Sequence, residues 1–495
     1  MRIQVTTLLL VVLVPTISGY SQELDRGHRI LLKHGLQLQA QVFPTKFNDV
    51  ETGFDRALWD ASGFTTVNLH HGNNNPGLYI GLPSEGQQWG RWVDSRDPYL
   101  YDRELIYLPN MVSIQVHDEV KAEILDPVGT GLIAYMTELK IRYPDVLIYT
   151  NQGGSQEHTN AELSNYMKLA QPHMLLFDAY TFYGHWPDKN IEYYSTSCTL
   201  YYRYLQQFRL LGLAGNDGTG RRPIPTGTYT QAFVPGNDHY ISESENRLSY
   251  FAPWAFGYKF TSAFTYDAPR EGWGPVVMFD GFDTSSLRPQ FQYFAETNRQ
   301  SRNLGPALVR LITTDIRMVM GRTKNRDGSV PLSTANTLPA EVQSWDSDAD
   351  SYITSITATN LGEKNNDSAG TKLPGDVIVG YFKPLDPAFA EPGHEDDIYF
   401  MIVNGLCDEE GLAVECRQKI QLTFDFKDSR INGLLRLSRE TGRVEAVSLV
   451  HHSGSLYSLD LYLDGGTGDL FKFNNGGYFV HQTHRGHSGI TGNTP

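Results

Sequence analysis

The stretch VSIQVHDE, residues 112–119, places two adjacent carboxylates directly after an apolar run. The run predicts a strand, and the carboxylates predict where that strand ends. In a β/α barrel, reactive groups gather at the end of the barrel where the strands finish. We therefore expect Asp118 and Glu119 to mark a site at such a strand end, provided that the flanking sequence builds the barrel.

The composition predicts a large folded protein that does not bind nucleic acid. The chain has 495 residues, of which 40% are apolar and 12% aromatic, enough for a sizeable core and more than one domain. Its formal net charge is −15, with 41 Lys and Arg against 56 Asp and Glu. Binding to a phosphate backbone requires Lys and Arg to neutralise it, so neither nucleic acid nor an anionic membrane is an expected partner.

The N-terminus reads as a secretory signal peptide over residues 1–22. Arg2 supplies the positive end, residues 8–14 are apolar, and the small residues Ser18 and Gly19 follow. The apolar stretch is too short to span a bilayer comfortably, so we expect cleavage and a secreted or periplasmic protein. A short anchor at the cell surface is the alternative.

Residues 24–305 predict a TIM (β/α)8 barrel. Apolar, strand-like runs alternate there with helical patterns, which is typical of a parallel β/α architecture. The expected strands are 36–42, 64–69, 78–82, 111–116, 146–151, 174–180, 225–231 and 260–267. The expected helices between them are 127–142, 160–170, 197–213, 242–258 and 289–303.

Residues 306–480 predict a C-terminal antiparallel β-sandwich. Long helical patterns fade, and short alternating segments separated by turn residues replace them. The expected strands include 351–358, 376–382, 397–403, 419–426, 458–463 and 469–473. Residues 481–495 are polar and rich in glycine, and we expect a flexible tail.

The carboxylate pair can serve acid/base chemistry. Side chains alternate along a strand, but the alternation loosens at its end, so both Asp118 and Glu119 could reach a cleft. A carboxylic acid there can protonate a leaving glycosidic oxygen, and its charged neighbour would raise its pKa. The alternative is a solvated loop end whose acids only cap a helix.

The chain resembles secreted glycoside hydrolases that carry a β/α barrel and a C-terminal β-sandwich, among them the retaining clan that includes β-galactosidases. In that clan the acid/base Glu follows an Asn at the end of the fourth strand. Glu119 matches this Glu, and Asp118 replaces the Asn. The clan places its nucleophile Glu at the end of the seventh strand, where residues 228–231 read TYTQ and offer no carboxylate. That departure puts a standard two-Glu mechanism in doubt.

An adjacent Asp-Glu pair also resembles the barrel enzymes that cleave N-acetylhexosaminides. That resemblance implies that Glu119 is the acid/base and that Asp118 orients the acetamido group of the substrate, which acts as nucleophile. A missing carboxylate on the seventh strand is then expected. Either resemblance implies hydrolysis of the O-glycosyl bonds of poly- or oligosaccharides, with no cofactor and no metal.

Other predicted strand ends carry side chains suited to a sugar site. Aromatic faces suit the C–H surfaces of a sugar, and amides and carboxylates suit its hydroxyls. Asp178 is the best alternative second carboxylate. The candidate substrate-binding residues are His70, Asn151, Tyr180, Trp186, Tyr229, Gln231, Tyr266 and Asp267.

The three cysteines predict one disulfide. Cys407 and Cys416 bracket a turn-like insert, and export would let them form a hairpin disulfide. Cys198 is left over and is expected to be a buried thiol. The chain has no CxxC pair, so a structural zinc site is not expected.

A second hypothesis comes from another functional class. The missing carboxylate on the seventh strand would also suit a non-catalytic glycan-binding protein that kept the barrel and lost the nucleophile. Turnover that depends on Glu119 would separate the two hypotheses.

Overall fold

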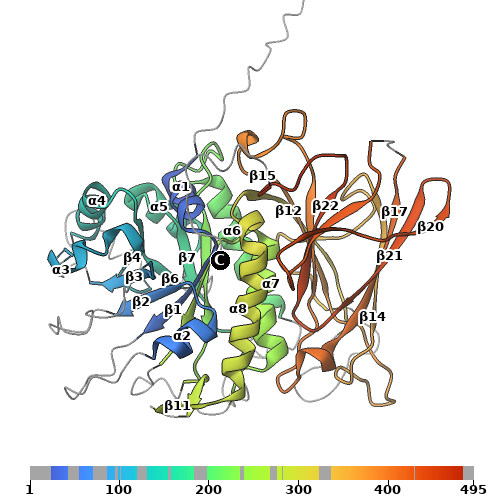
Figure 1. Ribbon diagram of the computed structural model, residues 1–495, viewed down its shortest axis with the longest axis horizontal. Coiled ribbons are helices and arrows are strands. Elements are labelled where there is room, and N and C mark those ends of the chain that lie inside the picture. The colour runs from blue at the N-terminus through green and yellow to red at the C-terminus, as the bar shows by residue number, and fades with distance from the viewer. Residues whose placement is uncertain are drawn as a thin grey trace, which may run out of the picture.

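The structure is a computed structural model that describes residues 24–42, 55–70, 86–94, 99–100, 102–119, 131–153, 158–182, 198–234, 239–267, 276–280, 283–322, 336–427 and 430–482 (Figure 1). The predicted signal peptide, the predicted strand at 78–82 and Trp186 lie outside these residues.

A parallel, nearly closed barrel forms the N-terminal half of the fold (Figure 1). Its strands are β1 (Gln37–Val42), β2 (Thr66–His70), β3 (Gln88–Val93), β4 (Met111–Val116), β5 (Leu147–Tyr149), β6 (Asn151–Gly153), β7 (Leu175–Asp178), β8 (Thr226–Gln231) and β9 (Phe260–Phe264). The sheet order is β5-β4-β3-β2-β1-β9-β8-β7-β6. Because only Thr150 separates β5 from β6, these two form one interrupted strand, and the nine strands fill eight positions. The predicted (β/α)8 barrel is confirmed.

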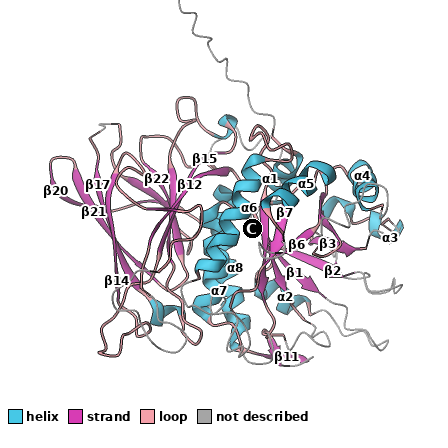
Figure 2. Cartoon of the chain, turned by 180° about the vertical axis from the view of Figure 1, so that it is seen from behind, coloured by secondary structure: helices cyan, strands magenta, loops and turns pink. Residues whose placement is uncertain are grey.

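Helices cover the outside of the barrel (Figure 2). Two of them, α5 and α7, begin with capping boxes, in which Thr159 pairs with Glu162 and Ser242 with Glu245. The helices are α1 (Arg26–His34), α2 (Arg56–Ser62), α3 (Asp102–Leu105), α4 (Leu132–Arg142), α5 (Asn160–Ala170), α6 (Thr199–Ala214), α7 (Glu243–Phe256) and α8 (Pro289–Leu308). A 3-10 turn, η2 (Leu108–Asn110), precedes β4, and a hairpin of β10 (Phe279–Asp280) and β11 (Asp283–Leu287) precedes α8.

The third barrel strand is β3, at residues 88–93 rather than at the predicted 78–82, which lie outside the described residues. Strand β3 lies between β2 and β4 and pairs with both in parallel. Its sequence, QWGRWV, holds a glycine and an arginine and therefore lacks the continuous apolar run that identifies a buried strand. The arginine is tolerated because Arg91, 1% exposed, forms an ion pair of 3.2 Å with Glu104 on α3.

The inside of the barrel holds both polar and apolar side chains. Strand β1 turns Gln37, Gln39 and Gln41 inward, and the Gln39 amide donates to the Ser113 hydroxyl on β4 at 3.1 Å. Strands β4, β5, β7 and β9 also supply apolar side chains, which pack with Ile30 and Leu31 of α1 in one buried cluster. Helix α1 therefore closes the N-terminal end of the barrel.

The burial of His28 on α1 makes the stability of the fold depend on pH. Burial, followed by the charge of Lys259, lowers the pKa of His28 to about 3. The folded protein therefore keeps His28 neutral, whereas the unfolded chain takes up a proton below its ordinary pKa of about 6.5. The stability linked to this residue is complete above that pH and is lost as the pH falls toward 3.

We expect this loss in denaturant titrations of the wild type and His28→Leu. Between pH 7 and pH 5, the free energy of unfolding of the wild type should fall by about 2 kcal/mol more than that of the variant. Other titrating groups change both proteins alike, so the difference isolates His28. Equal losses in the two proteins would contradict the assignment.

The C-terminal half is an antiparallel sandwich, as predicted. The seven-stranded sheet has the order β13-β12-β15-β16-β22-β18-β19, and the four-stranded sheet has the order β14-β17-β21-β20. Side chains from the two facing sheets fill a separate buried cluster between them. The strands are β12 (Leu311–Val319), β13 (Gln343–Ser344), β14 (Ile353–Asn360), β15 (Val377–Pro384), β16 (Tyr399–Asn404), β17 (Gln418–Asp425), β18 (Leu434–Leu437), β19 (Val444–Ala446), β20 (Val450–Ser453), β21 (Leu456–Leu463) and β22 (Gly468–Phe473), with short 3-10 turns η6 (Pro387–Phe389) and η7 (Ala413–Cys416).

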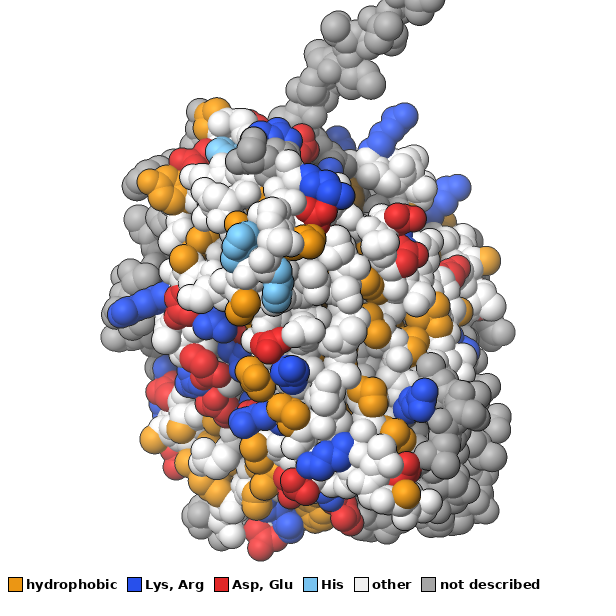
Figure 3. Space-filling view, turned by 90° about the vertical axis from the view of Figure 1, so that its right-hand side faces the viewer, with side chains coloured by type: hydrophobic (Ala, Val, Ile, Leu, Met, Phe, Trp, Pro, Cys, Tyr) orange, Lys and Arg blue, Asp and Glu red, His pale blue; other side chains and the backbone are white. Residues whose placement is uncertain are grey.

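The outer sheet of the sandwich faces solvent. Exposed and buried residues alternate along β21, as expected for a strand with one solvated face. Seen from this side, acidic and basic side chains are interspersed among scattered apolar ones (Figure 3).

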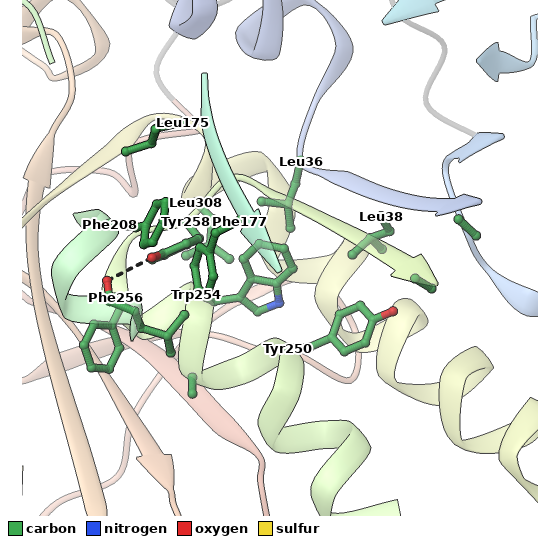
Figure 4. Packing of buried hydrophobic residues seen from close by; sticks show 14 of the residues in the cluster. Leu36, Leu38, Leu175, Phe177, Phe208, Tyr250, Trp254, Phe256, Tyr258 and Leu308 are labelled. Atoms are coloured by element: carbon green, nitrogen blue, oxygen red, sulfur yellow. Dashed lines mark hydrogen bonds between the residues drawn. The ribbon is translucent and has the colours of Figure 1, made fainter. Parts of the chain in front are cut away.

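Barrel and sandwich share a core. Helix α8 ends at Leu308 and β12 begins at Leu311, next to the predicted boundary at 305–306. Helices α6 to α8 lie between the barrel sheet and the sandwich (Figures 1 and 2). Around Trp254, aromatic rings of α7 and its neighbours pack with barrel residues such as Phe177 and Leu38 (Figure 4). The two halves therefore fold onto one continuous apolar layer.

Gly380 on β15 sets how closely α7 approaches the sandwich. A Cβ atom at this position would lie 2.0 Å from the carbonyl oxygen of Ala255. Gly380→Ala must push the helix and strand apart, so we expect the free energy of unfolding to fall by about 1–3 kcal/mol. Chemical denaturation measures this change against Thr357→Ala, an exposed substitution on β14. A loss no greater than that of the control would contradict the close packing.

None of the helices that the structure describes combines the length and apolarity needed to span a bilayer.

The predicted disulfide is not present. The structure holds Cys198, Cys407 and Cys416 as thiols. The sulfur of Cys407 lies 3.4 Å from that of Cys198 and hydrogen bonds with it. The pairing with Cys416 was inferred from a hairpin-like spacing, but the intervening residues instead form a loop and the turn η7.

Candidate active site

The turn after β4 presents the predicted carboxylate pair in a strained backbone. His117 and Glu119 have φ angles of 62° and 44°, in the left-handed region that non-glycine residues rarely adopt. Both Asp118 and Glu119 are exposed. Such conformations concentrate at functional sites, where surrounding contacts hold them.

Neighbouring strands hold this turn in place. The amide of His117 donates to the carbonyl oxygen of Val93 on β3 at 2.8 Å. The Gln115 side chain donates to the carbonyl oxygen of His117 at 3.3 Å. The turn is therefore anchored both from the next strand and from inside the barrel.

Asn151 brings two predicted carboxylates together. This residue is 1% exposed, and its Nδ2 donates to Asp118 Oδ1 at 2.8 Å and to Asp178 Oδ1 at 3.0 Å. Because both oxygens bind one nitrogen, they are no more than about 6 Å apart. Three residues predicted from separate strand ends thus form one group, here called the Asn151 bridge.

Tyr229 on β8 lies beneath the carboxylates. Its hydroxyl donates to Gln115 Oε1 at 2.6 Å and accepts from Gln41 Nε2 at 2.8 Å. Burial raises the pKa of Tyr229 well above its ordinary value, and the charges of Tyr149, Asp118 and Asp178 raise it further. The phenol therefore stays neutral. Because its hydroxyl is already bonded to Gln115 and Gln41, Tyr229 supports the Asn151 bridge from below and is not placed to bind a substrate.

Aromatic rings lie beside the carboxylates. Tyr180, half-buried after β7, meets Phe233 edge to face at 4.9 Å between ring centres. Phe264, at the end of β9, lies 6.3 Å from the rings of both Tyr180 and Tyr229. Rings at this position suit the apolar face of a sugar. Tyr180 was predicted from its strand end, whereas Phe233 and Phe264 were not among the predicted site residues.

Gln231 braces the site. It is 2% exposed, and its amide donates to the carbonyl oxygen of Phe182 at 2.9 Å. Its Oε1 is buried and has no hydrogen-bond partner among the described residues. The residue thus ties β8 to the segment after β7, while one acceptor is left for a further donor.

Tyr266 does not belong to the group around the Asn151 bridge, and its prediction as a substrate-binding residue is corrected. Its ring is 3% exposed and packs against Trp59, Phe64 and Phe279 at 5.1, 6.1 and 5.2 Å. Aromatic packing between the barrel and its helices explains this position. Burial, followed by the charge of the half-buried Asp267, raises the pKa of Tyr266 well above its ordinary value.

Of the last two predicted substrate-binding residues, His70 and Trp186, the structure describes only the backbone of His70. The backbone of His70 ends β2 and pairs with Trp92 on β3, which puts this residue at the same end of the barrel as Asp118. Trp186 lies outside the described residues.

The sequence of β1 contains a signal for the buried amides Gln41 and Gln115 that hydrogen bond to Tyr229 below the site. Strand β1 reads QLQAQV, a strict alternation of amide and apolar side chains. In a barrel whose outside is covered by helices, such alternation turns the polar side chains into the interior. Gln41 and, by the same logic on β4, Gln115 could therefore have been placed under the site.

Neither a protein-family model nor a curated protein matches the chain. Three solved structures show its similarity to known folds. The endo-beta-1,4-mannanase from Thermotoga petrophila is 10% identical, with 88% of this chain and 99% of that chain covered and a TM-score of 0.36. A protein described as a glycoside hydrolase is 9% identical, with 88% and 92% covered and a TM-score of 0.43. Saccharomyces cerevisiae Gas2p, bound to laminaritetraose and laminaripentaose, is 11% identical, with 49% and 56% covered and a TM-score of 0.31. Similarities this distant carry no argument about activity, so the function must be argued from the geometry of this chain.

Proposed function

We propose that the chain is an exported glycoside hydrolase that cleaves poly- or oligosaccharides where the barrel strands end. The observation that carries the proposal is the Asn151 bridge, which holds Asp118 and Asp178 close together beside Glu119. Glycosidic cleavage needs an acid for the leaving oxygen and a second carboxylate near the anomeric carbon. Asp118 and Glu119 after β4, with Asp178 at the end of β7, supply both the acid and the second carboxylate.

In this proposal, Glu119 is the general acid/base. Its carboxyl protonates the glycosidic oxygen as the bond to the anomeric carbon breaks, and its carboxylate later takes a proton from the attacking water. Glu119 is exposed at the end of a strained turn, so its carboxyl group is accessible to a substrate.

The Asn151 bridge supplies the second role. One carboxylate of the bridge either attacks the anomeric carbon or orients a substrate acetamido group that does so. The amide of Asn151 donates to both carboxylates and holds them in position. Activity confined to N-acetylhexosaminides would assign the attack to the acetamido group, and activity on plain hexosides would assign it to Asp178.

A screen of aryl glycosides and polysaccharides tests the proposal. The wild type is compared with Glu119→Gln, and Glu363→Gln is the matched control because the Glu363 side chain is 79% exposed on the sandwich. We expect turnover in the wild type and the control and its loss in Glu119→Gln.

The absence of a carboxylate at the end of β8 supports the alternative of a glycan-binding protein. Gln231 stands at that end and is already engaged with the backbone of Phe182. Binding of an oligosaccharide to the wild type without turnover, with the same affinity in Glu119→Gln, would favour this alternative over hydrolysis.

A further inference from the structure

Two cysteines from distant parts of the chain meet where the barrel joins the sandwich. Cys198 is the residue that precedes helix α6, and Cys407 follows strand β16. Their sulfurs are 3.4 Å apart although 209 residues separate them in sequence. The pair thus lies between a helix of the barrel and a loop of the sandwich.

The two thiols differ in access. Cys407 is 5% exposed, and its hydrogen bond with Cys198, followed by burial, raises its pKa well above the ordinary value. Cys198 is only half-buried, so a small reagent can reach it. A reactive cysteine must be accessible, which makes Cys198 the point of entry.

The third cysteine is enclosed. Cys416 is fully buried, and burial raises its pKa to about 12. A Cβ atom on Gly465 would lie 2.4 Å from its Cβ, and one on Gly411 would lie 3.0 Å from its sulfur, so the backbone packs tightly around it. Cys416 is therefore a packing residue.

We propose that Cys198 and Cys407 form a disulfide that links α6 to the loop after β16. The oxidant is a small-molecule disulfide such as oxidised glutathione. The Cys198 thiolate attacks one of its sulfurs, which forms a mixed disulfide and releases one glutathione thiolate. The Cys407 thiolate then attacks the Cys198 sulfur and releases the second. Two protein thiols lose two electrons and two protons, and one small-molecule disulfide becomes two thiols.

The approach that this bond requires is small. The sulfurs must move from 3.4 Å to the bonding distance of about 2.05 Å. Both cysteines lie next to the ends of regular elements rather than within them, where such a shift disturbs few backbone hydrogen bonds. A bond at this place would tie the barrel to the sandwich.

Peptide mapping of the full chain tests the proposal. The folded protein is reduced, freed of reductant and incubated with oxidised glutathione, and its peptides are then analysed without reduction. We expect a peptide pair linked through Cys198 and Cys407, and one remaining thiol at Cys416. The melting temperature should rise by roughly 5 °C over that of the reduced protein.

Two variants make the result specific. Cys416→Ser should keep both the linked peptide and the rise in melting temperature, whereas Cys198→Ser should lose both. Cys198 is half-buried, so the second variant is expected to fold even if Cys416→Ser does not. A Cys407–Cys416 link, glutathione retained on Cys198, or three unreacted thiols in the folded wild type would overturn the proposal.

Discussion

Glu119→Gln is expected to lower kcat/KM by about 10²–10⁴-fold on aryl glycosides with poor leaving groups. An amide of the same size cannot give a proton to the departing oxygen. Glycosides with strongly acidic phenols need no such proton for their departure, so the first cleavage step of these substrates should be affected far less. A pre-steady-state burst of phenol, measured on both substrate types, separates this step from the later hydrolysis.

The dependence on the leaving group distinguishes a proton donor from a residue that only supports the fold. A structural defect would slow both substrates by a similar factor, as would a role limited to sugar binding. Glu363→Gln should match the wild type on both. An equal loss on good and poor leaving groups would remove Glu119 from the role of acid.

Asn151→Leu is expected to lower kcat by at least about 10²-fold, since effects of this size follow from misplaced catalytic groups. Leucine has nearly the shape of asparagine, but it cannot donate to Asp118 and Asp178. The two carboxylates would lose the hydrogen bonds that the Asn151 amide now donates to Asp118 at 2.8 Å and to Asp178 at 3.0 Å. Their mutual repulsion would then move them apart or favour protonation of one of them.

The pH dependence of kcat distinguishes this effect from a loss of stability. If one carboxylate takes up a proton in Asn151→Leu, activity should partly recover as the pH rises. Asp178→Asn removes one of the two repelling charges, so its activity should not recover as the pH rises. A variant whose activity stays low at every pH, with an unchanged melting temperature, would show that the bridge does not control ionisation.

The barrel could be predicted because its strands are dictated by local patterns. The strand at 111–116 was placed at its observed bounds, since its apolar run ends abruptly at His117. The missed strand β3 depends on an ion pair between Arg91 and Glu104, a contact that no local pattern records. The alternating pattern of residues 306–480 predicted the sandwich, but the order of its strands depends on contacts across the whole chain.

The candidate site was predictable in part for the same reason. Asp118 follows the end of β4, Asp178 ends β7, and Asn151 begins β6 after the break at Thr150, so the parallel barrel brings the three side chains together. Tyr266 also ends a predicted strand, yet its ring turns into an aromatic cluster whose partner Trp59 comes from α2. The predicted disulfide between Cys407 and Cys416 was wrong because the sulfur that lies beside Cys407 is that of Cys198, 209 positions away in the sequence.

The most direct test of the account is the stereochemistry of the first product. Hydrolysis by the wild type of a glycoside found active in the screen is followed by ¹H NMR before the free sugar can mutarotate. In this account a carboxylate of the Asn151 bridge, or the acetamido group of the substrate, attacks the anomeric carbon before water does. Two successive displacements restore the configuration, so we predict that the first sugar released keeps the anomeric configuration of the substrate. Release of the opposite anomer, or no cleavage of any glycoside, would contradict the account.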